Sequence, residues 1–429
     1  MVSVSCRQSN AVSVVEARPY AVVLSGDTIP FTQLGQLNGD RLIVNKDFDM
    51  KGALSKLPKG VMLCFKGGVI RNGALEGDDT KIEGRGTMFD KVAIKGIWNV
   101  PKISTKMFSD LSYENALRDV VALASPKVQN RITIEKGDYW VKSERNGDVG
   151  LLLCSNTKLE LKDTIRLVPN DYKHYYIVRA TGENIHIGGN GCIIGDKPVH
   201  LGAEGQWGMG ISIMGAVNAS VKDLTIKECW GDCIYIGGRS KNVLIENCKL
   251  DNGRRQGVSV TKADGVTIKK CLIKNVSGTN PQYAIDIEPN RRDSVDNILI
   301  ENVTVLDCMG GIKATRGVPK DGAITPWLGR VTIKNCRVSC KTRFPISMRR
   351  CESAIVNNCI LSWARGKTAM VFLEVGEAIA EDNMFIPKGN LYETIRQYVK
   401  ESTGRDAGKL IRIDAVRKKS FKNNIIKGL

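Results

Sequence analysis

Residues 210–229 are GISIMGAVNASVKDLTIKEC, residues 232–248 are DCIYIGGRSKNVLIENC, and residues 256–271 are QGVSVTKADGVTIKKC. Each segment contains a short run of alternating apolar residues, a polar or glycine-containing turn, and a second such run that ends at Cys. YAIDIEPN, residues 283–290, opens a further unit. Alternation with a period of two is typical of β-strands. The sequence therefore predicts one strand–turn–strand unit that is stacked repeatedly, with any functional groups on the face that the repeats share.

The same unit recurs towards the C-terminus at uneven intervals. We align eight turn positions as equivalent: Glu228, Asn247, Lys270, Asn302, Asn335, Asn358, Asn383 and Asn424. Their spacing lies within the ~20–50 residues typical of solenoids and repeat arrays. A β-helix tolerates unequal repeats because extra residues bulge out of its turns, and Asn accepts the left-handed backbone of such turns. Cysteines that follow these turns are predicted to be small buried side chains in one column: Cys229, Cys248, Cys271, Cys336 and Cys359.

The net charge of the 429-residue chain is +18. This charge favours acidic polysaccharide, nucleic acid or a membrane surface as a partner, although lysines at outward strand positions also serve as a solvated surface that deters aggregation. No run reaches the ~18 apolar residues of a membrane-spanning helix, so a soluble protein is expected. The 13 cysteines contain no CxxC pair and the chain has three histidines, so no metal site of Cys or His is predicted.

Two regions are predicted along the chain. Residues 1–107 form an N-terminal β-rich region, and residues 108–429 form the repeat region, which begins with an amphipathic helix over residues 109–125. Two longer excursions interrupt the repeats, at residues 317–329 and at residues 390–404, and the second has the pattern of an amphipathic helix. Such excursions often wall a groove or contact a neighbouring subunit.

The face that the repeats share follows from strand alternation, because residues next to inward apolar positions point outward. The predicted inward set is Ile211, Ile234, Val258, Ile285, Ile312 and Ile346. The predicted outward set is Ser212, Tyr235, Ser259, Asp286, Lys313 and Ser347. A second outward set lies two residues further on: Met214, Gly237, Thr261, Glu288, Thr315 and Arg349. Stacked strands lie ~4.8 Å apart, so carboxylates and cations are expected to gather around Asp286.

Four residues are predicted to be catalytic: Asp232, Asp286, Glu288 and Lys313. Glycoside hydrolysis needs a carboxylic acid that protonates the leaving oxygen and a carboxylate that acts as base or nucleophile, and the three acids offer both. Elimination from a uronate needs a base and a cation beside the sugar carboxylate, for which Lys313 and nearby Tyr and Arg side chains are available. Asp286 and Glu288 are then candidate Ca²⁺ ligands. The sequence leaves hydrolysis and elimination open.

A second set of residues is predicted to bind substrate: Trp207, Tyr235, Arg254, Arg255, Gln256, Arg316, Arg349 and Arg350. Arginines suit an acidic sugar, and a Trp ring stacks on sugar rings or packs on the side of the solenoid. Structural roles are the alternative for all of these positions. Arg254 and Arg255 could pair with Asp251 and Asp286. Asp232, Asp286 and Glu288 could instead anchor turns through hydrogen bonds to the backbone.

Several segments resemble known families. The helix at residues 109–125 followed by the strand RITIEKGDYWV (131–141) resembles the entry into a right-handed parallel β-helix of the pectate lyase-like superfamily. GDCIYIGG (231–238) is similar to the Asp-Asp-Cys strand of polygalacturonases, with Asp232 at the second Asp. Gln256 stands where that family has His, Lys313 alone matches its Arg-Ile-Lys strand, and its Asn-Thr-Asp strand is absent. RRQGVSV (254–260) followed by AIDIEPN (284–290) also resembles β-helix proteins of gut bacteria and of phage tail spikes.

This resemblance implies an all-β, right-handed parallel β-helix that an N-terminal α-helix caps. It implies a carbohydrate-active enzyme, a glycoside hydrolase or polysaccharide lyase, that cleaves an acidic polysaccharide, with Ca²⁺ needed only in the lyase case. The alternative is a homotrimeric phage tail spike or a surface adhesin that binds glycan. Either protein would act outside the cytoplasm: in the periplasm, at the cell surface, extracellularly or on a virion tail. Nucleic acid is not expected as a partner, because no groove-binding helix or stacking motif is present.

Overall fold

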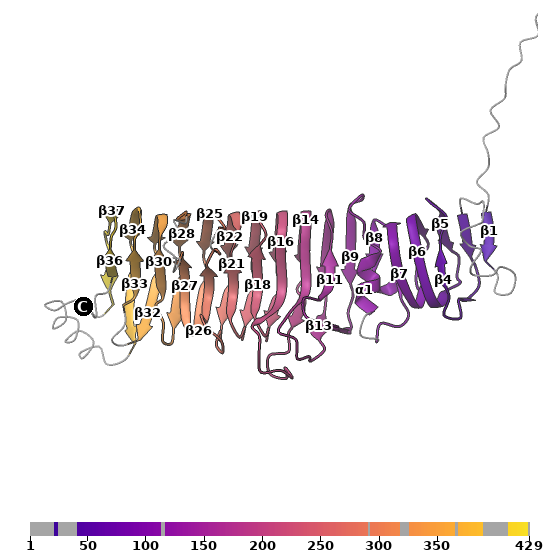
Figure 1. Ribbon diagram of the computed structural model, residues 1–429, viewed down its shortest axis with the longest axis horizontal. Helices are drawn as coiled ribbons and strands as arrows, with labels where there is room; N and C mark the ends of the chain where they lie inside the picture. The colour runs from indigo at the N-terminus through magenta and orange to yellow at the C-terminus, as the bar shows by residue number, and fades with distance from the viewer. Residues whose placement is uncertain are drawn as a thin grey trace, which may run out of the picture.

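The computed structural model describes residues 21–24, 41–112, 116–290, 292–317, 326–364, 368–388 and 411–427. The predicted helix at residues 390–404 and most of the excursion at residues 317–329 lie outside these ranges. The described chain winds as a parallel β-helix whose coils follow one another along a single long axis (Figure 1). Every strand pairing within it is parallel, and most strands pair with the equivalent strand of the next coil.

Each coil contributes strands to up to three faces of the helix. The first face contains β11 (Val149–Leu153), the first halves of β14 (His174–Gly188) and β16 (Trp207–Lys222), β18 (Asp232–Gly237), β21 (Gln256–Val260), β24 (Tyr283–Ile287), β27 (Gly310–Thr315), β30 (Ile346–Arg349), β33 (Met370–Leu373) and β36 (Ile411–Asp414). The second face contains β8 (Lys102–Ser104), β9 (Asn130–Ile134), β12 (Thr157–Leu161), the second halves of β14 and β16, β19 (Ser240–Glu246), β22 (Ala263–Lys269), β25 (Val295–Glu301), β28 (Leu328–Lys334), β31 (Cys351–Asn357), β34 (Glu377–Glu381) and β37 (Lys418–Ser420).

The third face is made of short strands: β10 (Asp138–Val141), β13 (Thr164–Leu167), β15 (Cys192–Ile194), β17 (Thr225–Lys227), β20 (Lys249–Asp251), β23 (Leu272–Lys274), β26 (Thr304–Cys308), β29 (Arg337–Cys340), β32 (Ile360–Ala364), β35 (Met384–Lys388) and β38 (Ile425–Ile426). Apolar side chains from all three faces fill one continuous core. Because each coil covers its neighbours, an outward residue on one strand lies beside its counterparts on the strands before and after it.

The N-terminal strands form a separate parallel sheet. It contains β1 (Ala21–Leu24), β2 (Arg41–Val44), β3 (Phe48–Asp49), β4 (Leu54–Lys56), β5 (Met62–Phe65), β6 (Ile70–Glu83) and β7 (Phe89–Asn99). Figure 1 shows this sheet continuing the long axis of the β-helix. A 3-10 helix, η2 (Thr105–Met107), follows β8. The hydrophobic core runs without a break from this sheet into the coils that follow.

A single α-helix, α1 (Ala116–Ala122), lies within the described residues, and it is shorter than the helix predicted over residues 109–125. It packs against β7 on one side and against β10 and β11 on the other. The Asp119 carboxylate accepts a hydrogen bond from the Ile94 N–H of β7 at 2.8 Å. The helix therefore covers the ends of the coils at the junction with the N-terminal sheet.

Left-handed residues mark more than one of the corners, whereas a single column was predicted. The column between the second and third faces contains Asp223, Asn247, Lys270, Asn302, Asn335, Asn358, Asp382 and Asn423, all with positive φ. Glu228 also has a positive φ, but it lies at the corner between the third and first faces. The predicted equivalence of Glu228 with Asn247, and of Cys229 with Cys248, is therefore wrong. A third-face strand of three residues brings the two corners close together in sequence, so they look alike.

The last two aligned positions are also wrong by one residue. Asn383 and Asn424 follow the left-handed residues Asp382 and Asn423. The buried Asn383 side chain accepts a hydrogen bond from the Cys359 N–H at 2.9 Å and donates one to the Val356 carbonyl at 3.0 Å. Asn383 thus occupies the place that Cys holds in the preceding coil.

The remaining cysteines of the predicted column are buried and stacked as expected. Each one directly follows a left-handed residue at the corner between the second and third faces: Cys248, Cys271, Cys336 and Cys359. Their thiols face carbonyl oxygens of the preceding coil, as in Cys248 to Val221 at 3.5 Å. All cysteines in the described part of the chain are free thiols, consistent with small apolar fillers rather than cross-links.

Candidate active site

The first face has the predicted register. The inward residues Ile211, Ile234, Val258, Ile285, Ile312 and Ile346 are paired strand to strand and buried. Beside them, the outward residues Ser212, Tyr235, Ser259, Asp286, Lys313 and Ser347 are paired in the same order. Asp286 of β24 therefore lies between Ser259 of β21 and Lys313 of β27.

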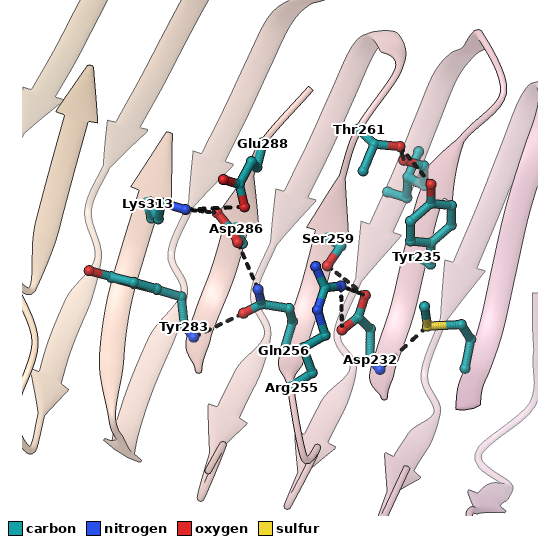
Figure 2. Close-up of polar contacts among 12 residues, drawn as sticks. Asp232, Tyr235, Arg255, Gln256, Ser259, Thr261, Tyr283, Asp286, Glu288 and Lys313 are labelled. Atoms are coloured by element: carbon teal, nitrogen blue, oxygen red, sulfur yellow. Dashed lines mark hydrogen bonds and ion pairs between the residues drawn. The ribbon is translucent and has the colours of Figure 1, made fainter. Parts of the chain in front are cut away.

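Asp286 is the central carboxylate of this face (Figure 2). Only 2% of the residue is exposed. Its Oδ2 accepts a hydrogen bond from Gln256 Nε2 at 2.7 Å, and its Oδ1 lies 3.4 Å from Lys313 Nζ. Gln256 is oriented in turn, because its Oε1 accepts a hydrogen bond from the Tyr283 N–H at 2.9 Å. The carboxylate is thus held rigidly between neighbouring strands.

The surroundings of Asp286 favour its protonated form. Burial raises the pKa of this carboxyl from 3.8 to about 7, because it removes water from around the charged form, and this effect outweighs the opposing charge of Lys313. The negative charge of Glu288 raises the pKa further, whereas Arg255 lowers it. A carboxyl with a pKa near neutrality can donate a proton at the pH at which most enzymes work.

Glu288 supplies a second carboxylate of different character. Lys313 Nζ lies 3.2 Å from Glu288 Oε2 and 3.4 Å from Asp286 Oδ1, so the ammonium bridges the two acids. The distance between Asp286 Oδ1 and Glu288 Oε2 therefore cannot exceed the sum of these two contact distances. The Glu288 side chain is 44% exposed. A buried carboxyl with a raised pKa and an exposed carboxylate thus lie side by side.

Asp232 forms a second centre at the start of β18. It is completely buried, with Arg255 Nη1 at 3.0 Å from its Oδ2 and the Ser259 hydroxyl donating to the same oxygen at 2.7 Å. Burial raises the pKa of Asp232, against the effect of Arg255 and Ser259. In register, Asp232 pairs with Gln256, whereas Asp286 pairs with Ser259. Because Asp232 is bonded to Ser259 of the outward set, the two acids lie on the same face, on either side of β21.

Strand β21 joins the two centres. Arg255, just before the strand, binds Asp232 directly and its charge also reaches Asp286. Gln256 binds Asp286, and Ser259 binds Asp232. Figure 2 shows two sets of contacts side by side. Asp232 and Arg255 form one set, and Gln256, Asp286, Glu288 and Lys313 form the other; we call the two sets together the polar cluster.

A family model described as a right handed beta helix region matches this chain over residues 174–320 and 209–390. The chain belongs to the right-handed β-helix family. Bacillus subtilis (strain 168) protein YclG, described as uncharacterized, is 28% identical over 222 residues. That alignment covers 43% of this chain and 38% of YclG, so the chain matches well under half of this relative.

Two solved structures share this fold. The tailspike protein of E. coli bacteriophage HK620, in complex with a pentasaccharide, aligns with a TM-score of 0.55 at 15% identity, covering 74% of this chain and 64% of the tailspike. The A-module of the Azotobacter vinelandii mannuronan C-5 epimerase AlgE6 aligns with a TM-score of 0.50 at 11% identity, covering 73% of this chain and 95% of the module. At these identities the likeness concerns the fold.

The other predicted binding residues of this right-handed β-helix protein lie outside the polar cluster. Arg349 and Arg350 both bind Glu374, at 2.7 Å and 2.8 Å. Arg316 is 1% exposed, and its guanidinium donates to the carbonyl oxygens of Asn290 and Asp293. The contacts of Arg316 hold the turn after β24 in place, and those of Arg349 and Arg350 join β30 to the residue that follows β33. All three arginines thus have the structural roles that the sequence left open.

The remaining predicted residues border the cluster on the side towards β16. Tyr235 is half-buried, and its hydroxyl lies 2.8 Å from Thr261 Oγ1. Arg254 lies over the Trp230 ring at 3.7 Å and donates to the Gly205 carbonyl at 2.8 Å. Trp207 begins β16 and is 46% exposed. None of these three side chains has a direct contact with Asp286 or Lys313 among the described interactions.

Tyr283 belongs to the site but was not predicted. Its backbone N–H orients Gln256, and its ring lies 5.9 Å from Lys313 Nζ. An aromatic residue at the first position of the strand YAIDI was the available signal. Burial raises the pKa of Tyr283 to about 12 and also raises that of Tyr235. Both phenols therefore stay protonated near neutral pH, which makes them poor bases for elimination.

The pair Asp286 and Glu288, considered as Ca²⁺ ligands, does not fit a divalent cation. The Lys313 ammonium occupies the position between the two carboxylates, where a Ca²⁺ ion would have to lie. Within the described ranges, no group of three or more His, Cys, Asp and Glu side chains is placed to hold a metal ion. No helix in the part of the chain that the structure describes is both long and apolar enough to cross a membrane.

Proposed function

We propose that this protein hydrolyses glycosidic bonds of an acidic polysaccharide on the first face, with Asp286 as general acid. The observation that carries the proposal is the pairing of a buried carboxyl, whose pKa is raised to about 7, with an exposed carboxylate at Glu288. Glycosidases use such a pair, in which one carboxyl protonates the leaving oxygen and the other acts as base or nucleophile.

In the proposed reaction, Asp286 donates its proton to the glycosidic oxygen as the bond to the anomeric carbon breaks. Glu288 either accepts a proton from the attacking water or attacks the anomeric carbon itself, with water releasing the sugar in a second step. The contacts through Lys313 keep the two acids close together. Gln256 is a positioning residue, because it fixes the orientation of Asp286.

The cations of the site support an acidic substrate. Lys313 contacts two carboxylates of the protein in the absence of substrate, and Arg255 contacts Asp232. A uronate carboxylate is attracted by the same cations, and the +18 net charge adds a long-range attraction for a polyanion. A secreted or virion-associated location follows from this proposal, because such polysaccharides occur outside the cytoplasm.

The test is incubation of the full chain with polygalacturonate, alginate and neutral dextran. We expect new reducing ends from an acidic polymer without the ultraviolet absorbance of an unsaturated uronate. Asp286→Asn and Glu288→Gln should each lower the rate by about 100-fold or more. The control is Glu301→Gln, which changes an acid of the same type in an ion pair with Lys334 at 2.9 Å on the second face; it should keep full activity. Formation of an unsaturated uronate would show that the protein cleaves by elimination and not by hydrolysis.

Glycan binding without cleavage is the second candidate function. It is favoured by the near-complete burial of Asp286 and by the engagement of Asp232 with Arg255 and Ser259, which would suit a rigid binding surface. The fold shared with a phage tailspike that binds a pentasaccharide supports the same proposal. Tight glycan binding with no product from any polymer, together with a trimeric mass in solution, would favour this candidate over hydrolysis.

A further inference from the structure

A second concave region lies on the second face, near the N-terminal sheet and away from the candidate active site. It consists of two cavities of about 550 and about 400 Å³. Both cavities are lined by Arg131 of β9 and Glu160 of β12, so they adjoin. Together they extend from the end of β6, past β8, β9 and β12, to the second halves of β14 and β16. We call this region the second-face groove.

Cations line the second-face groove in a regular array. Lys102, Arg131 and Lys158 are in register on the consecutive strands β8, β9 and β12, so one cation occurs on each of three successive strands. Parallel strands are ~4.8 Å apart, which sets the spacing of these charges along the axis. Other cations line the groove on both sides of this row. Arg85, Lys106 and Lys162 are exposed, whereas Lys222 is half-buried and pairs with Glu246 at 3.2 Å.

Only part of this charge is neutralised by the protein. Arg131 pairs with Glu160 at 2.8 Å, and Lys162 pairs with Glu135 at 3.1 Å. Lys102 and Lys158 form no ion pair with any residue that the structure describes, and the same holds for the groove cations Arg85 and Lys106. The groove therefore carries a net positive charge.

The positive charge of the groove also affects the pKa of the next residue in the row, His186. His186 of β14 is in register with Lys158, and its Nδ1 lies 2.9 Å from the Ser220 hydroxyl. Burial lowers the pKa of His186, and the charges of Lys222 and Lys158 lower it further. At this end the floor is backbone at Gly188 and Gly189, and a Cβ at Gly189 would come within 2.7 Å of the Leu161 carbonyl oxygen. The close packing of Gly189 against Leu161 therefore requires glycine at this position.

We propose that the second-face groove binds an anionic polysaccharide along the helix axis, at a site separate from the one that cleaves or recognises glycan on the first face. A polyuronate carries one carboxylate per sugar, and each sugar of an extended chain advances it by a length similar to one strand spacing. Successive carboxylates can therefore meet Lys102, Arg131 and Lys158. Among the described residues that line the groove there is no Phe, Tyr or Trp, whereas single-stranded nucleic acid is usually held by stacking on such rings.

The ligand class is shared with the proposed function, but the groove uses none of the residues of the first face. Such a site would hold a polymer on the enzyme between cleavage events. Attraction by unpaired surface cations should weaken as salt is added, because screening acts strongly on exposed charges.

The test uses the full chain with Asp286→Asn, which does not degrade its ligand, and short oligogalacturonates as the probe in calorimetry. We expect two oligomers per chain, of which one is lost or bound roughly tenfold more weakly in Lys102→Ala/Lys158→Ala. The control Lys241→Ala/Lys249→Ala removes two other exposed lysines and should leave both sites unchanged. Circular dichroism should show the same folded spectrum for all three chains.

Two results would overturn the inference: binding that Lys102→Ala/Lys158→Ala leaves unaltered, or an equal loss in the control. A tighter complex with single-stranded DNA than with oligogalacturonate would assign the groove to nucleic acid instead. Failure of the proposed function is distinguishable, because the wild-type chain would then release no reducing ends while the groove still bound oligomers.

Discussion

Replacing Asp286 with Asn should change how the stability of the protein depends on pH. The pKa of Asp286 is about 7 in the folded protein, against an ordinary value of 3.8. Between these two values the folded state holds a proton that the unfolded chain releases. Stability from this group is therefore fully present below the ordinary pKa and is lost as pH rises to the folded pKa.

The size of the effect follows from the same two values. Each pH unit in this window lowers the free energy of unfolding by about 1.4 kcal/mol, so the loss between about pH 5 and pH 8 is about 2.5 kcal/mol. Asn cannot ionise, and it can still accept the hydrogen bond from Gln256. The Asp286→Asn variant should therefore lack this loss.

Denaturant unfolding of both chains at several pH values measures the difference. We expect the stability of the wild-type chain to fall more steeply with pH than that of Asp286→Asn, by about 2.5 kcal/mol over this range. Asp138→Asn, at an exposed residue of β10, controls for the change in net charge and should follow the wild-type curve. Parallel curves for wild type and Asp286→Asn would refute a protonated Asp286 at neutral pH, and with it the general-acid role.

Three further substitutions test neighbouring parts of the account. Lys313→Met removes the cation 3.4 Å from Asp286, so the pKa of Asp286 should rise by about 1 unit or more. The pKa is measured from the carboxyl band in infrared difference spectra against Asp286→Asn. An unchanged or lower pKa would contradict the contact. Arg255→Ala leaves Asp232 buried without its ion pair, so the free energy of unfolding at pH 8 should fall by about 3 kcal/mol. A loss under about 1 kcal/mol would show that Asp232 is not buried as a charged group. Arg316→Ala should lower the free energy of unfolding by about 3 kcal/mol. Arg316→Lys should restore only part of that stability, because one ammonium cannot replace a guanidinium that donates to two carbonyls. Full rescue by Lys would contradict this geometry.

Strand alternation was enough to predict the first face. The inward isoleucines and valines and the outward row from Ser212 to Ser347 are arranged as expected, because a parallel solenoid places equivalent residues of successive coils side by side. The same reasoning placed Asp286 beside Lys313. What alternation does not give is the burial of Asp286, because that depends on side chains from neighbouring coils.

The corners and the long side chains were predicted less well. Cys229 was assigned to the wrong column because both corners combine a left-handed residue with a small one. Arg349 and Arg350 were expected to bind substrate, but they share Glu374 of a later coil, a residue with no repeat signal in the sequence. Long arginine side chains can reach several partners, so their contacts depend on turn geometry that local sequence does not specify.

The general-acid role of Asp286 is tested most directly by comparing two substrates of the Asp286→Asn variant. One is the acidic polysaccharide that the wild-type chain cleaves, and the other is an aryl glycoside of the same sugar with a good leaving group, which departs without protonation. We predict that the variant loses about 100-fold or more of its rate on the polysaccharide but keeps most of its rate on the aryl glycoside. Equal losses on both substrates would contradict proton donation by Asp286.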